Sequence, residues 1–142
     1  MGIIKRFDHL AIGVEDAEAA KHFFRDILGA EPLEDKGSSD AAKFTWDCFN
    51  LGGRKMEIVS PHESGEGGIG RYLAKYGQGY HHMTLAVENL DEAMAYFEKE
   101  GIRILAVDRS QENFQHFFLH PKDTFGASIQ IFEENDKTLD LA

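Results

Sequence analysis

The chain has 142 residues, of which 42% are hydrophobic, and its formal net charge is -10. This length corresponds to about one domain, which can bury a core without disulfide or metal staples. The single cysteine, Cys48, cannot form an intrachain disulfide, and no run approaches the roughly 18 apolar residues of a membrane-spanning helix. The acidic balance disfavours nucleic-acid binding. We therefore expect a cytoplasmic, soluble protein with neither membrane nor nucleic-acid partners.

The first half of the chain is expected to form a strand, a helix and three further strands. Alternating residues in HLAIGV (9–14) predict the first strand, and Asp16 is placed to cap the following helix. Gly29 stands where helices commonly stop. The three further strands are expected at 31–35, 43–51 and 55–60, with a Gly-Gly turn before the last.

The second half repeats this pattern after a Gly-rich connection and a short helix at 69–77. FDHLAIGVEDAEAAKHFF (7–24) aligns without a gap on YHHMTLAVENLDEAMAYF (80–97), which places His9 on His82. Two copies indicate a duplicated module rather than a solenoid. Asn89 is the second helix cap, strands are expected at 82–87, 102–107, 114–120 and 127–134, and residues 135–142 are expected to form a polar tail.

The last strand of each module carries one polar residue between apolar neighbours. Glu57 and Gln130 are separated by the same interval as His9 and His82, so each follows the histidine of its own module at the same spacing. A pseudo-two-fold axis relating the modules would bring His9, Glu57, His82 and Gln130 together. Two imidazoles, a carboxylate and an amide oxygen suit one divalent metal ion such as Co, Zn, Ni, Mn or Fe. The alternative is that both strands turn this face to solvent.

These residues lie in segments that resemble the vicinal oxygen chelate superfamily of glyoxalases, bleomycin resistance proteins and dioxygenases, and within it the methylmalonyl-CoA epimerases. The resemblance covers nearly the whole chain and is strongest in the segments FDHLAIGVEDAEAAKHFFRDILGA, LGGRKMEIVSP, YLAKYGQGYHHMTLAVENLDEA, GIRILAVD and FLHPKDTFGASIQIFEE. It implies an α+β fold in a single domain of residues 1–142. Two tandem βαβββ modules, about 5–62 and 78–134, would form an incomplete barrel around a metal cleft. The implied ligands are His9, Glu57, His82 and Gln130, and the implied assembly is a homodimer.

The resemblance also implies an isomerase that moves a proton at the carbon next to the thioester of an acyl-CoA, through a metal-bound enolate. Glu57 is a candidate acid/base group. Gln130 stands where the family generally has Glu, so the catalytic role of this position is open, because an amide cannot accept a proton at neutral pH. Asp47, the only carboxylate on its strand, is a further candidate base, or else an ordinary solvent-facing residue.

Lys122 and His120, in the HPKDT run, are candidates for substrate binding, with Lys122 facing the phosphates of an acyl-CoA. Two other enzyme classes fit the same residues: a glyoxalase-I-like lyase acting on a thiol hemithioacetal, and a ring-cleaving dioxygenase using His9, His82 and Glu57 alone. A non-catalytic member that only binds a metal or ligand is the remaining alternative. His81 matches Asp8 in the repeat, so we expect His81 to point away from the ligands.

Overall fold

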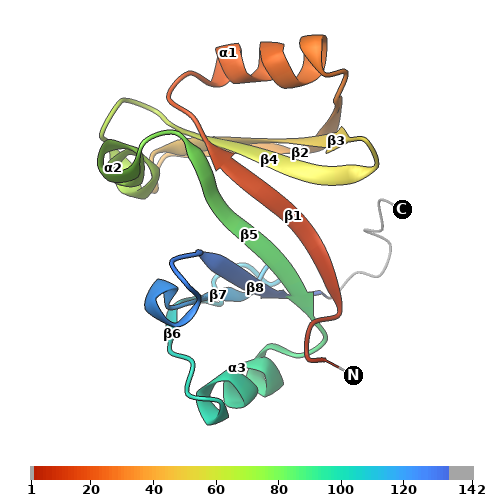
Figure 1. Cartoon of the computed structure of the whole chain (residues 1–142), viewed down its shortest axis with the longest axis vertical. Helices are drawn as coiled ribbons and strands as arrows, with labels where there is room; N and C mark the ends of the chain where they lie inside the picture. The colour runs from red at the N-terminus through yellow and green to blue at the C-terminus, as the bar shows by residue number, and fades with distance from the viewer. Residues whose placement is uncertain (1, 135–142) are drawn as a thin grey trace. The chain divides into compact units, whose positions relative to one another are not determined.

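The computed structural model describes residues 2–134, and the expected polar tail at 135–142 lies outside them. Figure 1 shows the chain from its N-terminal strand to the last described strand. Strand, helix and three strands are followed by a helix, and then by strand, helix and three strands again. The succession of elements expected from the repeat is therefore confirmed. No helix among the described residues is long and apolar enough to cross a membrane.

The first module begins with a strand and a capped helix. Asp16 caps the helix, because the backbone N–H of Ala19 donates to its Oδ1 at 3.1 Å. After one turn the helix widens to π winding, in which Leu28 N donates to Phe23 O at 3.0 Å. The sequence pattern had predicted one continuous α-helix. The elements are β1 (Arg6–Gly13), α1 (Ala17–Lys21), the π-helical η1 (His22–Ile27), β2 (Glu31–Ser39), β3 (Phe44–Leu51) and β4 (Arg54–Pro61).

The second module repeats this order after a separate helix. Asn89 caps its helix as predicted, accepting from Glu92 N at 2.9 Å. The strand expected from 102 begins later, because Ile102 N donates to Phe97 O and so still closes the preceding helix. The elements are α2 (Gly67–Tyr76), β5 (Gly79–Val87), α3 (Leu90–Lys99), β6 (Ile104–Asp108), β7 (His116–Leu119), the 3-10 turn η2 (Pro121–Asp123) and β8 (Ile129–Glu133).

The described residues fall into two compact units. One runs from Leu10 to His81 and is called here the Glu57 unit; the other joins the residues up to His9 to those from His82 onward and is called the His82 unit. The boundaries cut β1 after His9 and β5 before His82, so both repeated histidines belong to the His82 unit. The strand order is β2-β3-β4-β1 in the Glu57 unit and β5-β8-β7-β6 in the His82 unit.

The first and last strands of each module are paired in parallel and in the same register. Ala11 stands opposite Glu57 in the pairing of β1 with β4, and Thr84 stands opposite Gln130 in the pairing of β5 with β8. Because paired residues in adjacent strands project to the same face, each pair lies side by side. The strand pairing therefore makes Ala11 the neighbour of Glu57 and Thr84 the neighbour of Gln130.

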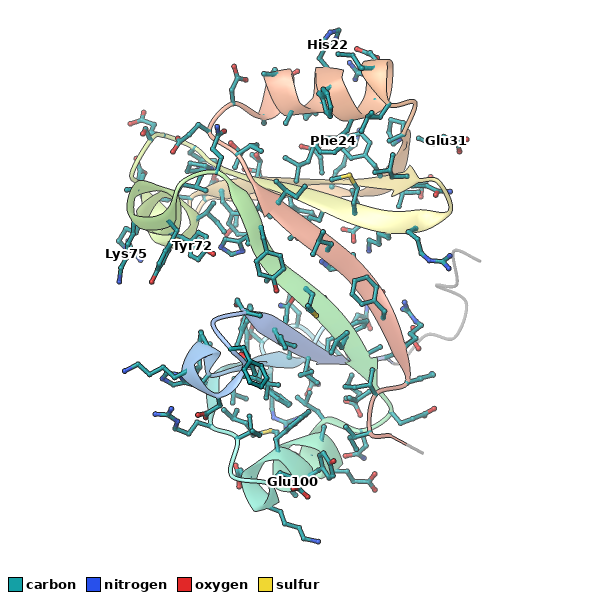
Figure 2. The ribbon with its side chains drawn as sticks, in the orientation of Figure 1. His22, Phe24, Glu31, Tyr72, Lys75 and Glu100 are labelled. Carbon is teal, nitrogen blue, oxygen red and sulfur yellow. The ribbon has the colours of Figure 1, made fainter. Side chains whose placement is uncertain are left out.

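Each unit has its own hydrophobic core beneath one helix. Figure 2 shows Phe24 directed toward the strands below it, whereas His22 points away. Each helix presents one apolar face, which packs on the inward residues of the strands. The buried residues of the two cores are Val14, Ala30, Phe49, Met56 and Ile58 in the Glu57 unit, and Val87, Leu90, Ala93, Phe117, Leu119 and Ile131 in the His82 unit.

Within the His82 unit, the buried carboxylate of the residue after β8 binds two basic side chains near the start of the chain. Glu134, 7% exposed, accepts hydrogen bonds from Arg6 Nε at 2.7 Å and from Arg6 Nη2, and its Oε2 lies 2.9 Å from Lys5 Nζ. Burial raises the pKa of this carboxyl group, but the hydrogen bonds from Arg6 and Lys5 together with their positive charges lower it further. The pKa of Glu134 therefore lies below its ordinary value.

This lowered pKa predicts a loss of stability in acid. A group with a depressed folded-state pKa stabilises the fold above its unfolded pKa, and this contribution is lost as the pH falls through the folded-state value. The substitution Glu134→Gln should therefore lower the free energy of unfolding at about pH 7 more than at about pH 3. Urea denaturation of the parent and of the Glu134→Gln variant at the two pH values measures these free energies. If the variant lost the same amount at both pH values, the lowered pKa of Glu134 would be contradicted.

Candidate metal centre

The His82 unit brings together three of the four predicted ligands. These three residues are buried, with only 6–7% of their surface exposed: His9, His82 and Gln130. The rings of His9 and His82 meet edge to face, with their centroids 5.7 Å apart. Thr84 joins them to Gln130: its hydroxyl oxygen lies 3.1 Å from His9 Nε2 and 2.9 Å from Gln130 Oε1. Three residues distant in sequence thus share one buried polar cluster.

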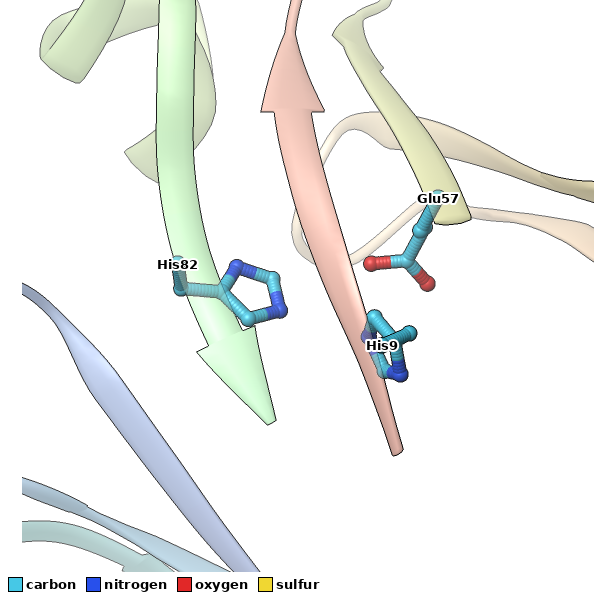
Figure 3. A group of neighbouring side chains, drawn as sticks. All are labelled: His9, Glu57 and His82. Atoms are coloured by element: carbon cyan, nitrogen blue, oxygen red, sulfur yellow. The ribbon is translucent and has the colours of Figure 1, made fainter. Parts of the chain in front are cut away.

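The fourth predicted ligand, Glu57, lies on β4 and is partly buried. One ligand atom from each of His9, Glu57 and His82 lies within 4.8 Å of the others. Figure 3 shows these three side chains. Cys48, opposite Glu57 on β3, places its sulfur 3.8 Å from Glu57 Oε2. Burial raises the pKa of the Cys48 thiol, and the negative charge of Glu57 raises it further, so this cysteine is held as an uncharged thiol.

The donor set fits a divalent cation. Polar side chains on buried strand faces cost free energy unless they are paired, and these side chains converge instead of spreading over an exposed face. Two imidazoles and one carboxylate are ligands that Zn²⁺ and other transition metals accept in proteins, and an amide oxygen can add a fourth. The alternative of two solvent-facing strands does not agree with the burial of His9, His82 and Gln130.

The residue before the first histidine forms a hydrogen bond with one ring nitrogen of that histidine. Asp8 Oδ2 lies 2.6 Å from His9 Nδ1, and Asp8 Oδ1 is ion-paired with Arg6 Nη1 at 2.7 Å. A carboxylate at Nδ1 favours the proton on that nitrogen, which leaves the lone pair on Nε2. Metal-binding histidines commonly have such a carboxylate on their second nitrogen. Sequence reasoning missed this role of Asp8, although the Asp-His dipeptide was its signal.

The neighbouring histidine lies in different surroundings. His81 packs in the Glu57 unit against Tyr72 of α2, with ring centroids 4.6 Å apart. Burial lowers the pKa of His81, and the negative charge of Glu57 offsets this only in part. His81 therefore packs within the Glu57 unit, and its orientation away from the ligands stays a prediction.

The structure does not bring Asp47 to the candidate centre. Asp47 stands opposite Ile58, whereas Cys48 stands opposite Glu57, so alternation along β3 turns Asp47 to the other face. There its Oδ2 lies 3.5 Å from Lys21 Nζ, the lysine at the end of α1. Asp47 is therefore an ion-pair partner of a helix and not a base beside Glu57.

The two predicted substrate-binding residues lie in the turn η2. His120 Nδ1 accepts from the backbone N–H of Lys122 at 3.1 Å, which caps this turn. Arg103 is held by Asp123 through its Nε and Nη2, both at 2.9 Å. The side chain of Lys122 is exposed. His120 thus has a local structural contact, and the substrate-binding roles of His120 and Lys122 stay predictions.

Comparison with known proteins identifies the family of the chain. Residues 8–119 match the family described as the Glyoxalase/Bleomycin resistance protein/Dioxygenase superfamily, and the chain belongs to this superfamily. It is 32% identical over 133 residues to the mitochondrial methylmalonyl-CoA epimerase of Mus musculus, covering 89% of this chain and 71% of the relative. It is also 32% identical to the ethylmalonyl-CoA/methylmalonyl-CoA epimerase of Cereibacter sphaeroides, covering 91% and 98%.

A solved structure confirms the fold. The crystal structure of methylmalonyl-CoA epimerase from Mycobacterium tuberculosis superposes with a TM-score of 0.83 at 23% identity, covering 96% of this chain and 93% of that one. The expected glyoxalase-like α+β fold is therefore confirmed. The sequence matches place the chain, within the superfamily, among the methylmalonyl-CoA epimerases, which are isomerases.

The two adjacent histidines provide a matched test of the metal centre. His82→Gln should lower the affinity for Co²⁺ by about 100-fold or more, because the loss of a ligand costs at least as much as the loss of a residue that orients one. His81→Gln should leave the affinity within about threefold of the parent, since His81 packs on Tyr72. Isothermal titration calorimetry with Co²⁺, alongside thermal unfolding of both variants, measures this. Equal losses in both variants would contradict the assignment.

Proposed function

We propose that this protein is a divalent-metal-dependent epimerase of the methylmalonyl-CoA type. The observation that carries the proposal is the convergence of His9, His82 and Glu57, whose ligand atoms lie within 4.8 Å of one another. Gln130 is linked to His9 through the Thr84 hydroxyl. This donor set occurs in a chain whose relatives are named methylmalonyl-CoA epimerases.

His9, Glu57, His82 and Gln130 would hold the metal, with Co, Zn, Ni, Mn or Fe as the candidates. When bound, the metal would supply positive charge that opposes the negative charge developing on the substrate as a proton leaves. Asp8 keeps the lone pair of His9 on Nε2, so this residue prepares one ligand before any cation arrives.

Glu57 is the group proposed to move the proton. Among the four proposed ligands, it is the one carboxylate, and an amide such as Gln130 cannot accept a proton at neutral pH. The substrate proton lies on the carbon next to the thioester, where its removal leaves charge on the adjacent oxygen atoms. Glu57 would take this proton, and a water molecule would return a proton to the opposite face of the same carbon, which completes the epimerisation. Gln130, held by Thr84, would contribute binding only.

The substrate is proposed to be an acyl-CoA with a carboxylate on the reacting carbon. The names of the relatives in mouse and Cereibacter support this class. Lys122, an exposed cation in the turn η2, is the proposed contact for the CoA phosphates, and His120, which caps the same turn, is the second proposed contact. A homodimer in the cytoplasm remains the prediction for its assembly and location.

The proposal is tested by exchange of the substrate proton for deuterium. With Co²⁺-loaded protein in D₂O, mass spectrometry should detect uptake of one deuterium into methylmalonyl-CoA. Glu57→Gln should slow this exchange by about 10²–10⁴-fold, the usual contribution of a general base. Asp47→Asn is the matched control and should leave the rate within about threefold, because Asp47 faces Lys21.

Three outcomes would contradict the proposal. Turnover of a glutathione hemithioacetal without exchange on methylmalonyl-CoA would favour the lyase. Oxygen uptake on a catechol by Fe²⁺-loaded protein would favour the dioxygenase. Stoichiometric metal binding without any of these activities would favour a member of the superfamily that only binds. Metal content is measured for each variant, so that a lost ligand is distinguished from a lost base.

A further inference from the structure

The hydroxyl group of Thr84 faces two acceptors and has one proton. Asp8 at Nδ1 of His9 leaves a lone pair on Nε2, which lies 3.1 Å from Thr84 Oγ1. On the other side, Gln130 Oε1 lies 2.9 Å from the same oxygen. Thr84 is fully buried, at 0% exposure. A hydroxyl donates one hydrogen bond only, and the two acceptors therefore compete for it.

The corresponding pair in the other half of the repeat lacks such a hydroxyl. Thr84 stands opposite Gln130, and Ala11, the counterpart of Thr84 in the first module, stands opposite Glu57. The carboxamide is thus paired with a hydroxyl and the carboxylate with a methyl group. This difference has a chemical reason. Both ends of a carboxylate are oxygens, but only one end of a carboxamide can bind a cation, so the amide needs a partner that selects its orientation.

We infer that Thr84 is a positioning residue that turns the oxygen of Gln130, and not its NH₂ group, toward the metal. The inference rests on the proposed metal centre. When a cation occupies His9 Nε2, the Thr84 proton has Gln130 Oε1 as its remaining acceptor. The amide oxygen has a second lone pair, which stays available for the cation. Without the hydroxyl, the buried amide has lost the contact that distinguishes its two ends.

The test compares two substitutions at Thr84 in two backgrounds. Thr84→Val keeps the shape and removes the hydroxyl; it should weaken Co²⁺ binding by about 10–100-fold, the usual effect of losing a residue that orients a ligand. Thr84→Ser keeps the hydroxyl and should restore the parent affinity to within about threefold. In the background Gln130→Glu, where both ends of the side chain are oxygens, Thr84→Val should cost less than about threefold.

Calorimetric affinity for Co²⁺ is the readout, with thermal unfolding measured for each variant. An equal loss from Thr84→Val in both backgrounds would overturn the inference and leave Thr84 a packing residue. Parent affinity in the Thr84→Val protein would overturn it too. If the parent itself does not bind Co²⁺ stoichiometrically, the proposed function fails. Failure of the inference is thereby distinguished from failure of the metal centre.

Discussion

A polar side chain on a buried strand face must find a partner, and this constraint governs β8 and the residue that follows it. Near the start of β8, Gln130 is paired with Thr84, and Thr84 in turn lies against His9. Just beyond its end, the Glu134 carboxylate is neutralised by Arg6 and Lys5. An unpaired polar group at either place would cost about 1–3 kcal/mol. β8 thus carries a proposed metal ligand, and the residue after it pairs with the basic residues of the N-terminal segment.

The duplicated module keeps the ligand positions and changes their neighbours. Glu57 and Gln130 occupy equivalent places, but the first stands opposite Ala11 and the second opposite Thr84. Likewise Asp8 contacts His9 through Nδ1, whereas its counterpart His81 packs on Tyr72. One half therefore carries a carboxylate, which is the proposed base, and the other carries an amide that accepts a hydrogen bond from a hydroxyl group. The two halves have thus diverged around the proposed ligand positions.

The sequence predicts the fold well because the repeat supplies long-range information that local propensity lacks. One constant offset relates the two histidines and also their partners Glu57 and Gln130, and the parallel registers of the two modules reproduce this offset. The position of Asp47 could also have been predicted. A two-residue turn at Gly52 and Gly53 pairs Leu51 with Arg54, which places Cys48, and not Asp47, opposite Glu57.

Two other features could not be predicted from the sequence. Thr84 lies in an alternating strand, where threonine is common for reasons of packing alone, so its hydroxyl gave no separate signal. Its role depends on His9, which is distant in the sequence, and on the rotamers of both side chains. The π winding after Lys21 could not be predicted either. Over a segment of six residues, the spacing of apolar side chains does not distinguish a π-helix from an α-helix.

The central claim is that His9, Glu57, His82 and Gln130 hold one divalent cation. A crystal structure of the Co²⁺-loaded protein, with anomalous data collected at the cobalt edge, tests it most directly. We expect one strong anomalous peak per chain, bonded to the Nε2 atom of His9, to His82, to the Glu57 carboxylate and to Gln130 Oε1. A peak bound elsewhere, or a peak at the histidines with Glu57 and Gln130 both turned away from it, would contradict the account.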